Sequence, residues 1–210
     1  MKQRGRSAPL RGLYAITPDF ADRRRLRDLV AQALEGGIAA LQYRCKSLPS
    51  SPRLEEATAL AALCRSRGVP FIVNDDLGIA IAADADGAHL GRDDGDLAAA
   101  RAMLGDKLLG ASCYDSLAGA RDAVAAGADY VAFGSVFPSP TKPAALRAPL
   151  TLFAEAKPLG VPLVAIGGVS LENAPQLIAA GADCLAVISD LFDANDVRDR
   201  ARAYGKLFSS

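Results

Sequence analysis

Short apolar segments of strand-forming residues recur eight times along the chain. Most are continuous apolar runs rather than alternations of apolar and polar residues, which is typical of parallel strands covered by helices. The eight predicted strands are GLYAIT (12–17), AALQYR (39–44), FIVND (71–75), GAHLG (87–91), LLGAS (108–112), YVAFGS (130–135), LVAIGG (163–168) and CLAVIS (184–189).

Stretches rich in Ala and Leu, with helical spacing, separate these strands, and several of them stop at a glycine, as a helix C-terminus does. Eight strand–helix units in 210 residues leave about 26 residues for each unit. This pattern predicts an α/β fold: a single-domain (β/α)8 TIM barrel over residues 12–210, preceded by a flexible N-terminal tail over residues 1–11. A doubly wound open sheet is the competing architecture, but the chain lacks the GxGxxG motif of the dinucleotide-binding form.

The charge balance argues against two classes of partner. Lys plus Arg and Asp plus Glu each number 24. Proteins that bind nucleic acid or membrane surfaces usually carry a basic surplus, so neither partner is expected. No segment approaches the roughly 20 apolar residues that span a bilayer. The basic opening MKQRGRSAPLRG has no apolar run behind it and is expected to be a loose tail.

The four cysteines form no CxxC pair and are far apart in the sequence. They are therefore expected to be reduced thiols in a cytoplasmic protein. The sequence leaves open whether that protein acts as a monomer or a homo-oligomer. The cysteines are Cys45, Cys64, Cys113 and Cys184.

Polar side chains concentrate where the predicted strands end, which is where a TIM barrel builds its active site. Gln42, Arg44 and Lys46 occupy alternate positions, so their side chains share one side of an extended chain. The other candidates are Asn74 and Asp75 after the third strand, His89, Arg92, Asp93 and Asp94 around the end of the fourth, Ser112 at the fifth, Ser139, Thr141 and Lys142 after the sixth, Gly167 and Gly168 at the seventh, and Ile188 and Ser189 at the eighth.

Cations and carboxylates together at one rim indicate a polyphosphate ester and a divalent metal. Lys and Arg bind phosphoryl oxygens, and carboxylates hold Mg²⁺, which bridges to the same phosphates. Gly167-Gly168 and Ser189 fit the monophosphate site common in this fold, so two phosphorylated small-molecule substrates are expected. His89 is the only histidine, which excludes a multi-histidine metal centre and a histidine-based triad of the usual spacing. The inventory favours stabilisation of a leaving anion over covalent catalysis.

These residues lie in an ordered set of motifs that resembles the thiamine phosphate synthase family over about residues 12–208. The resemblance implies a TIM barrel. It also implies a reaction that joins 4-amino-2-methyl-5-hydroxymethylpyrimidine diphosphate to 4-methyl-5-(2-phosphoethyl)thiazole, giving thiamine monophosphate and pyrophosphate. The motifs are YAIT, QYRCK, FIVNDD, GAHLGRDD, GAS, GADYVAFGSVFPSPTK, AIGGVSLEN and AVIS.

The resemblance also implies a role for each matching position. Arg44, Lys46, Ser112 and Lys142 would be catalytic, with Ser112 touching the pyrimidine or its leaving group. The pyrimidine diphosphate would be held by Gln42, Arg44, Lys46, Asn74 and Lys142, Mg²⁺ by Asp75 and Asp94, and the thiazole phosphate by Ser139, Thr141, Gly168, Ile188 and Ser189. The implied mechanism is dissociative: the aminopyrimidine expels pyrophosphate, and the thiazole nitrogen captures the resulting methylene cation.

Several of these residues have a structural alternative. Asp75 could cap a helix, and either Asp94 or Asp96 could cap the helix that follows them. Asp76 is expected to be a cap that faces solvent. His89 is expected to be a hydrogen-bonded structural histidine. Tyr14 and Tyr43 are expected to be packing residues, and the basic run ADRRRLRD (21–28) a solvated helix face.

The chain departs from the family pattern at a few positions. Tyr114 stands where many members carry histidine, and Arg92 replaces a common glutamine. The segment PAALRAPL after Lys142 lacks a glycine often found there. Asp190 places a negative charge beside the predicted phosphate site.

Two other functions compete with the synthase interpretation. One is a thiazole tautomerase, an isomerase that lacks the diphosphate-binding set. Intact Gln42, Arg44, Lys46, Asp75 and Asp94 argue against it. The other is a non-catalytic barrel that binds a thiamine precursor phosphate.

Overall fold

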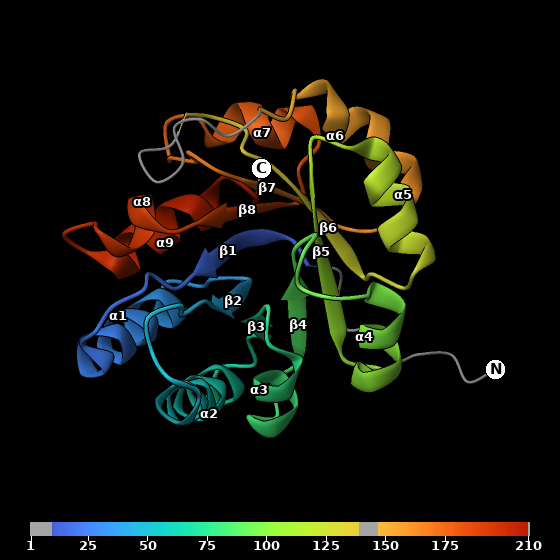
Figure 1. Cartoon of the computed structure of the whole chain (residues 1–210). Coiled ribbons are helices and arrows are strands. Elements are labelled where there is room, and N and C mark those ends of the chain that lie inside the picture. Colours follow the sequence, from blue (N-terminus) through green and yellow to red (C-terminus); the bar gives the residue numbers. More distant parts are fainter. Residues whose placement is uncertain (1–9, 139–146, 210) are drawn as a thin grey trace.

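The computed structural model describes residues 10–138 and 147–209, and within them the strands close into a barrel. Every strand is parallel to its neighbours, the strands follow one another in chain order, and β8 returns to pair with β1 (Figure 1). The strands are β1 (Gly12–Ile16), β2 (Ala40–Tyr43), β3 (Phe71–Asn74), β4 (Gly87–Leu90), β5 (Leu108–Tyr114), β6 (Tyr130–Phe133), β7 (Leu163–Ile166) and β8 (Cys184–Val187).

Helices surround this barrel and cover its outer face (Figure 1). They are α1 (Arg23–Glu35), α2 (Ser50–Ser66), α3 (Leu77–Ala82), α4 (Leu97–Leu104), α5 (Leu117–Ala125), α6 (Thr151–Ala156), α7 (Ala174–Ala180), α8 (Ser189–Phe192) and α9 (Val197–Lys206), with a short 3-10 turn at Lys157–Leu159. The predicted single-domain TIM barrel is confirmed, and the open-sheet alternative is wrong because the closed ring leaves no sheet edge.

The strands are largely apolar because both of their faces are buried. One set of side chains packs outward against the helices, and the alternate set fills the barrel. In the interior, the large rings of Tyr14 and Tyr130 lie among small neighbours such as Ala40, Ala132 and Ala186. This mixture of large and small residues fills the interior without a pore.

The predicted strands extend one or two residues too far at most of their C-terminal ends. Phe133 ends β6, for example, whereas the sequence predicts a strand to residue 135. The polar residues beyond these ends lie on the rim instead of in the sheet. β5 instead extends past its predicted end at residue 112. It continues to Tyr114, with a register shift against β6.

The predicted tail and the loop after β6 lie largely outside the described residues. Positions 1–9 and 139–146 are outside the described residues, and the predicted site residues Ser139, Thr141 and Lys142 are among them. At the start of the described chain, Leu10 is buried in the barrel-interior cluster, and the Arg11 guanidinium lies 5.7 Å from the centroid of the Phe208 ring.

The cysteines and the hydropathy of the helices agree with the sequence. All four cysteines are free thiols. Burial raises the pKa of Cys64, Cys113 and Cys184 to about 12, which makes these thiols poor nucleophiles. Within residues 10–138 and 147–209, no helix combines the length and the apolar character needed to cross a membrane.

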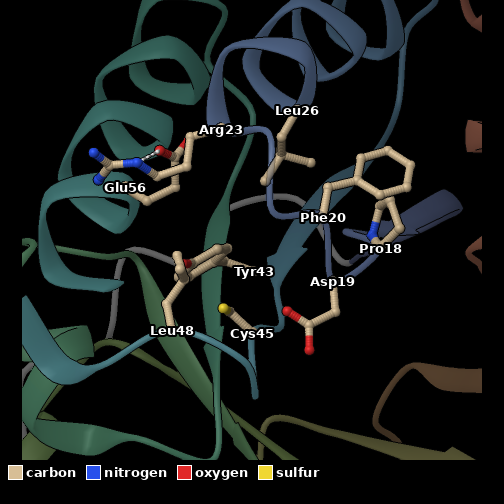
Figure 2. A pocket seen from close by; sticks show the side chains of 9 residues that line it. All are labelled: Pro18, Asp19, Phe20, Arg23, Leu26, Tyr43, Cys45, Leu48 and Glu56. Carbon is tan, nitrogen blue, oxygen red and sulfur yellow. Dashed lines mark ion pairs between the residues drawn. The ribbon is translucent and has the colours of Figure 1, made fainter. Parts of the chain in front are cut away.

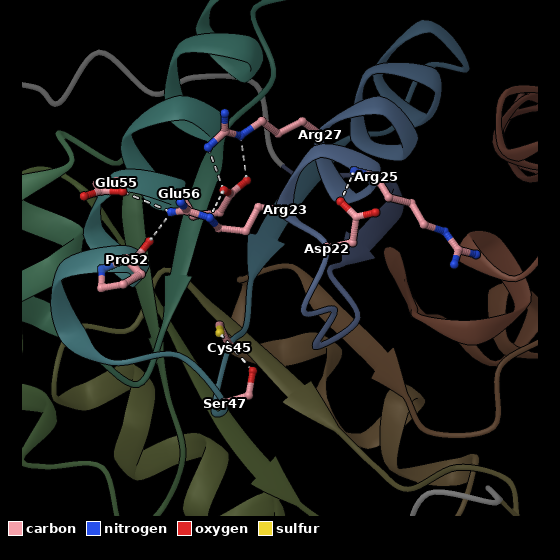
Figure 3. Close-up of polar contacts among 9 residues, drawn as sticks. All are labelled: Asp22, Arg23, Arg25, Arg27, Cys45, Ser47, Pro52, Glu55 and Glu56. Atoms are coloured by element: carbon pink, nitrogen blue, oxygen red, sulfur yellow. Dashed lines mark hydrogen bonds and ion pairs between the residues drawn. The ribbon is translucent and has the colours of Figure 1, made fainter.

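The basic run at residues 21–28 is a solvated helix face in part: Arg24 and Arg25 are exposed, as expected, but Arg23 and Arg27 contact α2. Arg27 binds the buried carboxylate of Glu56 on α2 through two hydrogen bonds, of 3.0 Å and 2.8 Å (Figure 3). Arg23 also reaches α2, where it donates to Glu55 at 3.1 Å and lies 4.0 Å from Glu56. Because a buried carboxylate needs a partner, these contacts join α1 to α2.

Candidate active site

Two carboxylates face each other at the C-terminal rim, Asp75 after β3 and Asp94 after β4. Asp75 has a φ of 65°, which is unusual for a residue other than glycine. Its N–H donates to the carbonyl of His89 at 2.9 Å, so the neighbouring strand holds this conformation. A sparsely populated conformation that the surrounding structure fixes is often found at a functional site.

The charges around Asp75 favour a cation between the two carboxylates. Burial, together with the facing Asp94 carboxyl, raises the pKa of Asp75 to about 6. Lys46 and Arg44 act in the opposite direction, which places both cations on the same side of the rim as Asp75. Neither cation has an ion-pair partner within 4.0 Å among the described residues.

Asp96, and not Asp94, caps α4. The Asp96 carboxylate accepts from the N–H of Ala99 at 2.7 Å. Asp94 instead accepts from the N–H of Gly91 at 2.9 Å. A Cβ at Gly91 would lie 2.6 Å from the Asp94 carboxylate, so this turn requires a glycine.

Asp76 is confirmed as a cap. Its carboxylate accepts from the N–H of Ile79 at 2.9 Å, at the start of α3, and also pairs with Arg53 at 2.6 Å. Asp75 itself is left outside the capping arrangement, as the metal-ligand hypothesis requires.

An open cleft of about 510 Å³ lies over these groups. It is lined by Cys45, Lys46, Arg53, Asn74, Asp75, Asp76, Leu77 and Asp94. The cleft therefore brings together residues from β2, β3 and β4 that the sequence predicts to bind a diphosphate and its metal. Its polar, charged lining suits a phosphorylated ligand better than an apolar one.

The loop after β2 is held by the end of β1. Thr17 accepts from the N–H of Arg44 at 2.9 Å, and Asp19 accepts from the N–H of Lys46 at 3.1 Å and from the Ser47 hydroxyl at 2.7 Å. These bonds use the backbone of the loop and leave the side chains of Arg44 and Lys46 for a ligand.

Gln42 and Ser112 lie deeper than the rim, at the two ends of a buried chain of hydrogen bonds. Gln42 Nε2 donates to Tyr14 Oη at 3.1 Å, and Tyr14 Oη lies 2.7 Å from Tyr130 Oη. Tyr130 Oη lies 3.1 Å from His89 Nδ1, and His89 Nε2 lies 2.9 Å from Ser112 Oγ. The expected structural role of His89 is confirmed, and Tyr14 does more than pack.

All five members of this chain are neutral near pH 7. Burial lowers the pKa of His89 to about 4 and raises the pKa values of Tyr14 and Tyr130 above their ordinary value. Sequence reasoning missed Tyr14 and Tyr130 here. The alternation of Tyr130 with the small inward-facing Ala132 on β6 is the one signal that could have placed its ring inside the barrel.

The turn after β7 packs tightly against the loop after β6. Gly167 and Gly168 have φ values of 98° and 66°, and a Cβ on Gly168 would lie 2.8 Å from Phe137. The N–H of Phe137 donates to the Gly167 carbonyl at 3.0 Å, and Asn173 Nδ2 donates to the Gly168 carbonyl at 2.9 Å. The double glycine is therefore required by backbone shape and by close approach.

On the far side of this turn, Ile188 precedes α8 and Ser189 is its first residue. Asp190, which follows, directs its carboxylate toward α9. There it binds Arg200 at 3.1 Å and accepts from the Tyr204 hydroxyl at 2.7 Å. Its negative charge is thus compensated, and the predicted conflict with a phosphate at Gly168 and Ser189 is removed.

The two departures at residues 92 and 114 contact each other. The Arg92 guanidinium lies 4.7 Å from the centroid of the Tyr114 ring. Tyr114 is 40% exposed, and its φ is 55°. The pair lies at the rim beside Gly91, where an added Cβ would be 3.6 Å from the Tyr114 hydroxyl.

A second indentation lies between the loop after β1 and α2 (Figure 2). It is lined by Pro18, Asp19, Phe20, Arg23, Leu26, Tyr43, Cys45, Leu48 and Glu56, and it has no room for a water molecule. It is therefore a packing defect rather than a ligand site.

Comparison with known proteins shows the family of this chain. The family model described as thiamine monophosphate synthase matches residues 13–191. The thiamine-phosphate synthase of Aromatoleum aromaticum is 59% identical over 203 residues, covering 96% of this chain and 98% of the relative. That of Methylobacillus flagellatus is 55% identical over 202 residues, covering 96% and 97%.

A solved structure is also similar throughout. Thiamine phosphate pyrophosphorylase from Pyrococcus furiosus superposes with a TM-score of 0.85 at 35% identity, covering 94% of this chain and 95% of that one. Both the sequence matches and the structural match extend across the barrel and its rim. This chain belongs to the thiamine monophosphate synthase family.

Proposed function

We propose that this chain is a thiamine-phosphate synthase that joins the pyrimidine diphosphate to the thiazole phosphate and releases pyrophosphate. The observation that carries this proposal is the charged rim. Two facing carboxylates, Asp75 and Asp94, share it with Arg44 and Lys46, whose charges have no ion-pair partner in the described parts of the chain. A diphosphate with a divalent cation would satisfy all four groups.

The rim residues fit Mg²⁺ as the cation. Within the described residues there is no cluster of three or more His, Cys, Asp or Glu that could hold a metal by itself. Mg²⁺ is commonly held by one or two carboxylates together with substrate phosphates. Asp75 and Asp94 would be those carboxylates, and the raised pKa of Asp75 is evidence of a repulsion that a cation would relieve. Bound there, Mg²⁺ would supply positive charge to the leaving phosphate oxygens.

The residues of this chain then have distinct tasks. Arg44, Lys46 and Lys142 bind the diphosphate and stabilise the charge that it gains as it leaves. In the proposed dissociative step, the bond between the methylene carbon and the diphosphate oxygen breaks, and its electron pair leaves with pyrophosphate. The thiazole nitrogen then donates its lone pair to the methylene carbon. No general base is needed, so the task of the protein is to position the rings and stabilise the charge.

The thiazole phosphate is proposed to bind on the opposite side of the barrel mouth. Gly168, Ile188 and Ser189 lie there, at the ends of β7 and β8. The positive φ of Gly168 and the absence of a Cβ bring its backbone close to this region, which suits an anion held by backbone N–H groups. Ser139 and Thr141 would complete this site, and Asn74 and Ser112 would contact the first substrate.

The two alternative functions have less support. The chain keeps the diphosphate-binding set that an isomerase would not need, and it has Tyr114 where the tautomerase would want histidine. The non-catalytic interpretation rested partly on the charge of Asp190, which Arg200 and Tyr204 compensate.

The test is product identification with purified protein and both substrates in the presence of Mg²⁺. The expected products are thiamine monophosphate and pyrophosphate in equal amounts, and neither should form when one substrate is omitted. Binding of both substrates without either product would favour the non-catalytic barrel and contradict the proposal.

A further inference from the structure

The buried chain between Gln42 and Ser112 crosses the barrel interior, and its three middle members are not among the residues proposed to bind the diphosphate. Its middle members come from distant strands: Tyr14 from β1, Tyr130 from β6 and His89 from β4. A simple packing role would not require a hydroxyl or an imidazole nitrogen at every step. The continuity of four contacts between 2.7 Å and 3.1 Å therefore calls for a reason.

Gly110 leaves the space that the side chains of this buried chain occupy. In the strand register His89 is opposite Gly110, and Gly110 is opposite Tyr130. Because Gly110 has no side chain, the His89 and Tyr130 rings stack across it with centroids 5.6 Å apart. A Cβ at this position would lie 2.5 Å from His89 Nδ1 and would also clash with the Tyr130 ring.

The direction of every hydrogen bond follows from one end of the chain. Gln42 Nε2 can only donate, so the Tyr14 hydroxyl accepts from it. The proton of this buried hydroxyl needs an acceptor, and Tyr130 Oη lies 2.7 Å away, so Tyr14 donates to Tyr130. Tyr130 accepts that bond and gives its own proton to His89 Nδ1. An imidazole that accepts at Nδ1 has no proton there, so the ring is neutral and carries its proton on Nε2, where it donates to Ser112 Oγ.

This direction determines what the two ends offer to a ligand. Because Ser112 Oγ accepts from His89, its own proton is left to donate outward. Because the Gln42 amide nitrogen donates to Tyr14, the Gln42 carbonyl oxygen remains available to accept a hydrogen bond from a ligand. A 4-aminopyrimidine matches this pair, since its amino group donates and its ring nitrogens accept.

We propose that Tyr14, Tyr130 and His89 are positioning residues that fix Gln42 as the acceptor and Ser112 as the donor toward the pyrimidine ring. The identity of that ring rests on the proposed function, whereas the direction of the chain does not. A reversed chain would present Gln42 N–H groups to the substrate amino group, donor against donor. The neutral, enclosed chain thus selects one orientation of the ring.

The first experiment measures the tautomer of the histidine directly. Because the sequence contains a single histidine, an untagged protein labelled with ¹⁵N-histidine gives one pair of imidazole nitrogen signals. At pH 7.5 the expected result is a neutral ring with the proton on Nε2. A proton on Nδ1, or an imidazolium, would overturn the proposal whether or not the protein is active.

The second experiment breaks the chain at its centre with Tyr130→Phe. The expected result is about a tenfold loss in kcat/KM for the pyrimidine diphosphate, the size of one hydrogen bond, with an unchanged KM for the thiazole phosphate. The His89 signals should also change toward a mixture of the two tautomers. A purely structural role would not move these two quantities together.

Tyr43→Phe is the matched control. Tyr43 is also a buried strand tyrosine, but its hydroxyl is not a member of the chain from Gln42 to Ser112, and its ring packs toward the helices. It should keep the wild-type kcat/KM and tautomer. Equal losses in both variants, or no loss in Tyr130→Phe, would contradict the proposal. An inactive wild-type protein with the proton on Nε2 would instead refute the proposed function and leave the direction of the chain standing.

Discussion

Two polar groups of residues lie at the same end of the barrel, and they differ in charge and in exposure. The rim carries Arg44, Lys46, Asp75 and Asp94 beside an open cleft. The interior chain, from Gln42 to Ser112, carries no charge near pH 7, and each member is hydrogen-bonded to the next. Among the residues that the structure describes, the rim cations have no ion-pair partner, whereas the neutral groups are hydrogen-bonded to one another in the barrel interior.

This difference follows from the cost of burial. An ionised group inside the barrel would lose several kcal/mol of solvation unless it were paired, whereas a neutral chain satisfies its own donors and acceptors. Charge that must respond to a leaving diphosphate therefore belongs at the rim. Groups that must recognise a ring by hydrogen-bond direction can be fixed deep inside. Four changes, taken from the largest expected effect to the smallest, test this contrast.

The largest effect is expected from Asp75→Asn. This variant removes the carboxylate that we propose as a metal ligand, and kcat should fall on the order of 10³-fold in a pyrophosphate-release assay. Asp93→Asn is the matched control, since Asp93 is exposed and close by in the sequence to Asp94. Near wild-type turnover of Asp75→Asn would refute the metal assignment.

Lys46→Met should have the next largest effect. The exposed ammonium of Lys46 would pair with the negative charge that develops on the leaving pyrophosphate. Removing it should lower kcat by roughly 10²-fold. The fold should be unchanged, because the backbone of Lys46 rather than its side chain binds Asp19. Arg24→Met on α1 removes an exposed cation that does not line the cleft and should leave turnover unchanged. Equal losses in the two variants would show a general charge effect.

The pH dependence of Mg²⁺ binding should be smaller but specific to Asp75. Its pKa is raised to about 6, so below that pH a proton competes with the metal. In titrations of Mg²⁺ into protein with pyrophosphate, affinity should fall by up to tenfold for each pH unit below about 6.

The same pKa has a consequence for stability in the absence of metal. Because the pKa in the folded chain lies above the ordinary value, ionisation of Asp75 opposes folding. The contribution of protonated Asp75 to the free energy of unfolding is fully present below pH 3.8 and is lost as pH rises through about 6. The free energy of unfolding of wild type relative to Asp75→Asn should therefore decrease between these values. An increase would contradict the assignment.

The smallest effect on activity is expected at Arg27→Met, in the contact between α1 and α2, because Arg27 does not line the cleft. This variant leaves the buried Glu56 carboxylate with Arg23 alone, at 4.0 Å. Urea unfolding should show a loss of about 1–3 kcal/mol, with turnover unchanged in the folded protein. Arg202→Met breaks an exposed pair with Asp199 and should cost less than about 1 kcal/mol. A similar cost for both variants would show that burial of Glu56 has little importance.

The fold and much of the rim could be predicted from the sequence because they depend on local patterns. Each strand has its own apolar run, and each polar residue of interest follows a strand directly, as Asp75 does after β3. A barrel brings all such positions to one end, so their proximity follows from chain order.

The remaining features depend on contacts between distant residues. Tyr14 and Tyr130 are 116 positions apart, and no local pattern indicates that their hydroxyls meet. Glu56 likewise lies 29 positions from Arg27, so their contact could not be predicted from the basic run. The choice between Asp94 and Asp96 as the cap was local but ambiguous, because both precede the same helix.

The most direct test of the charged rim is the Mg²⁺ dependence of pyrophosphate release by the wild-type protein and Asp75→Asn. Our account predicts release by the wild type that rises and saturates with Mg²⁺, with thiamine monophosphate as the other product, and little release by Asp75→Asn at any Mg²⁺ concentration. Equal release by both proteins, or release that does not depend on Mg²⁺, would contradict it.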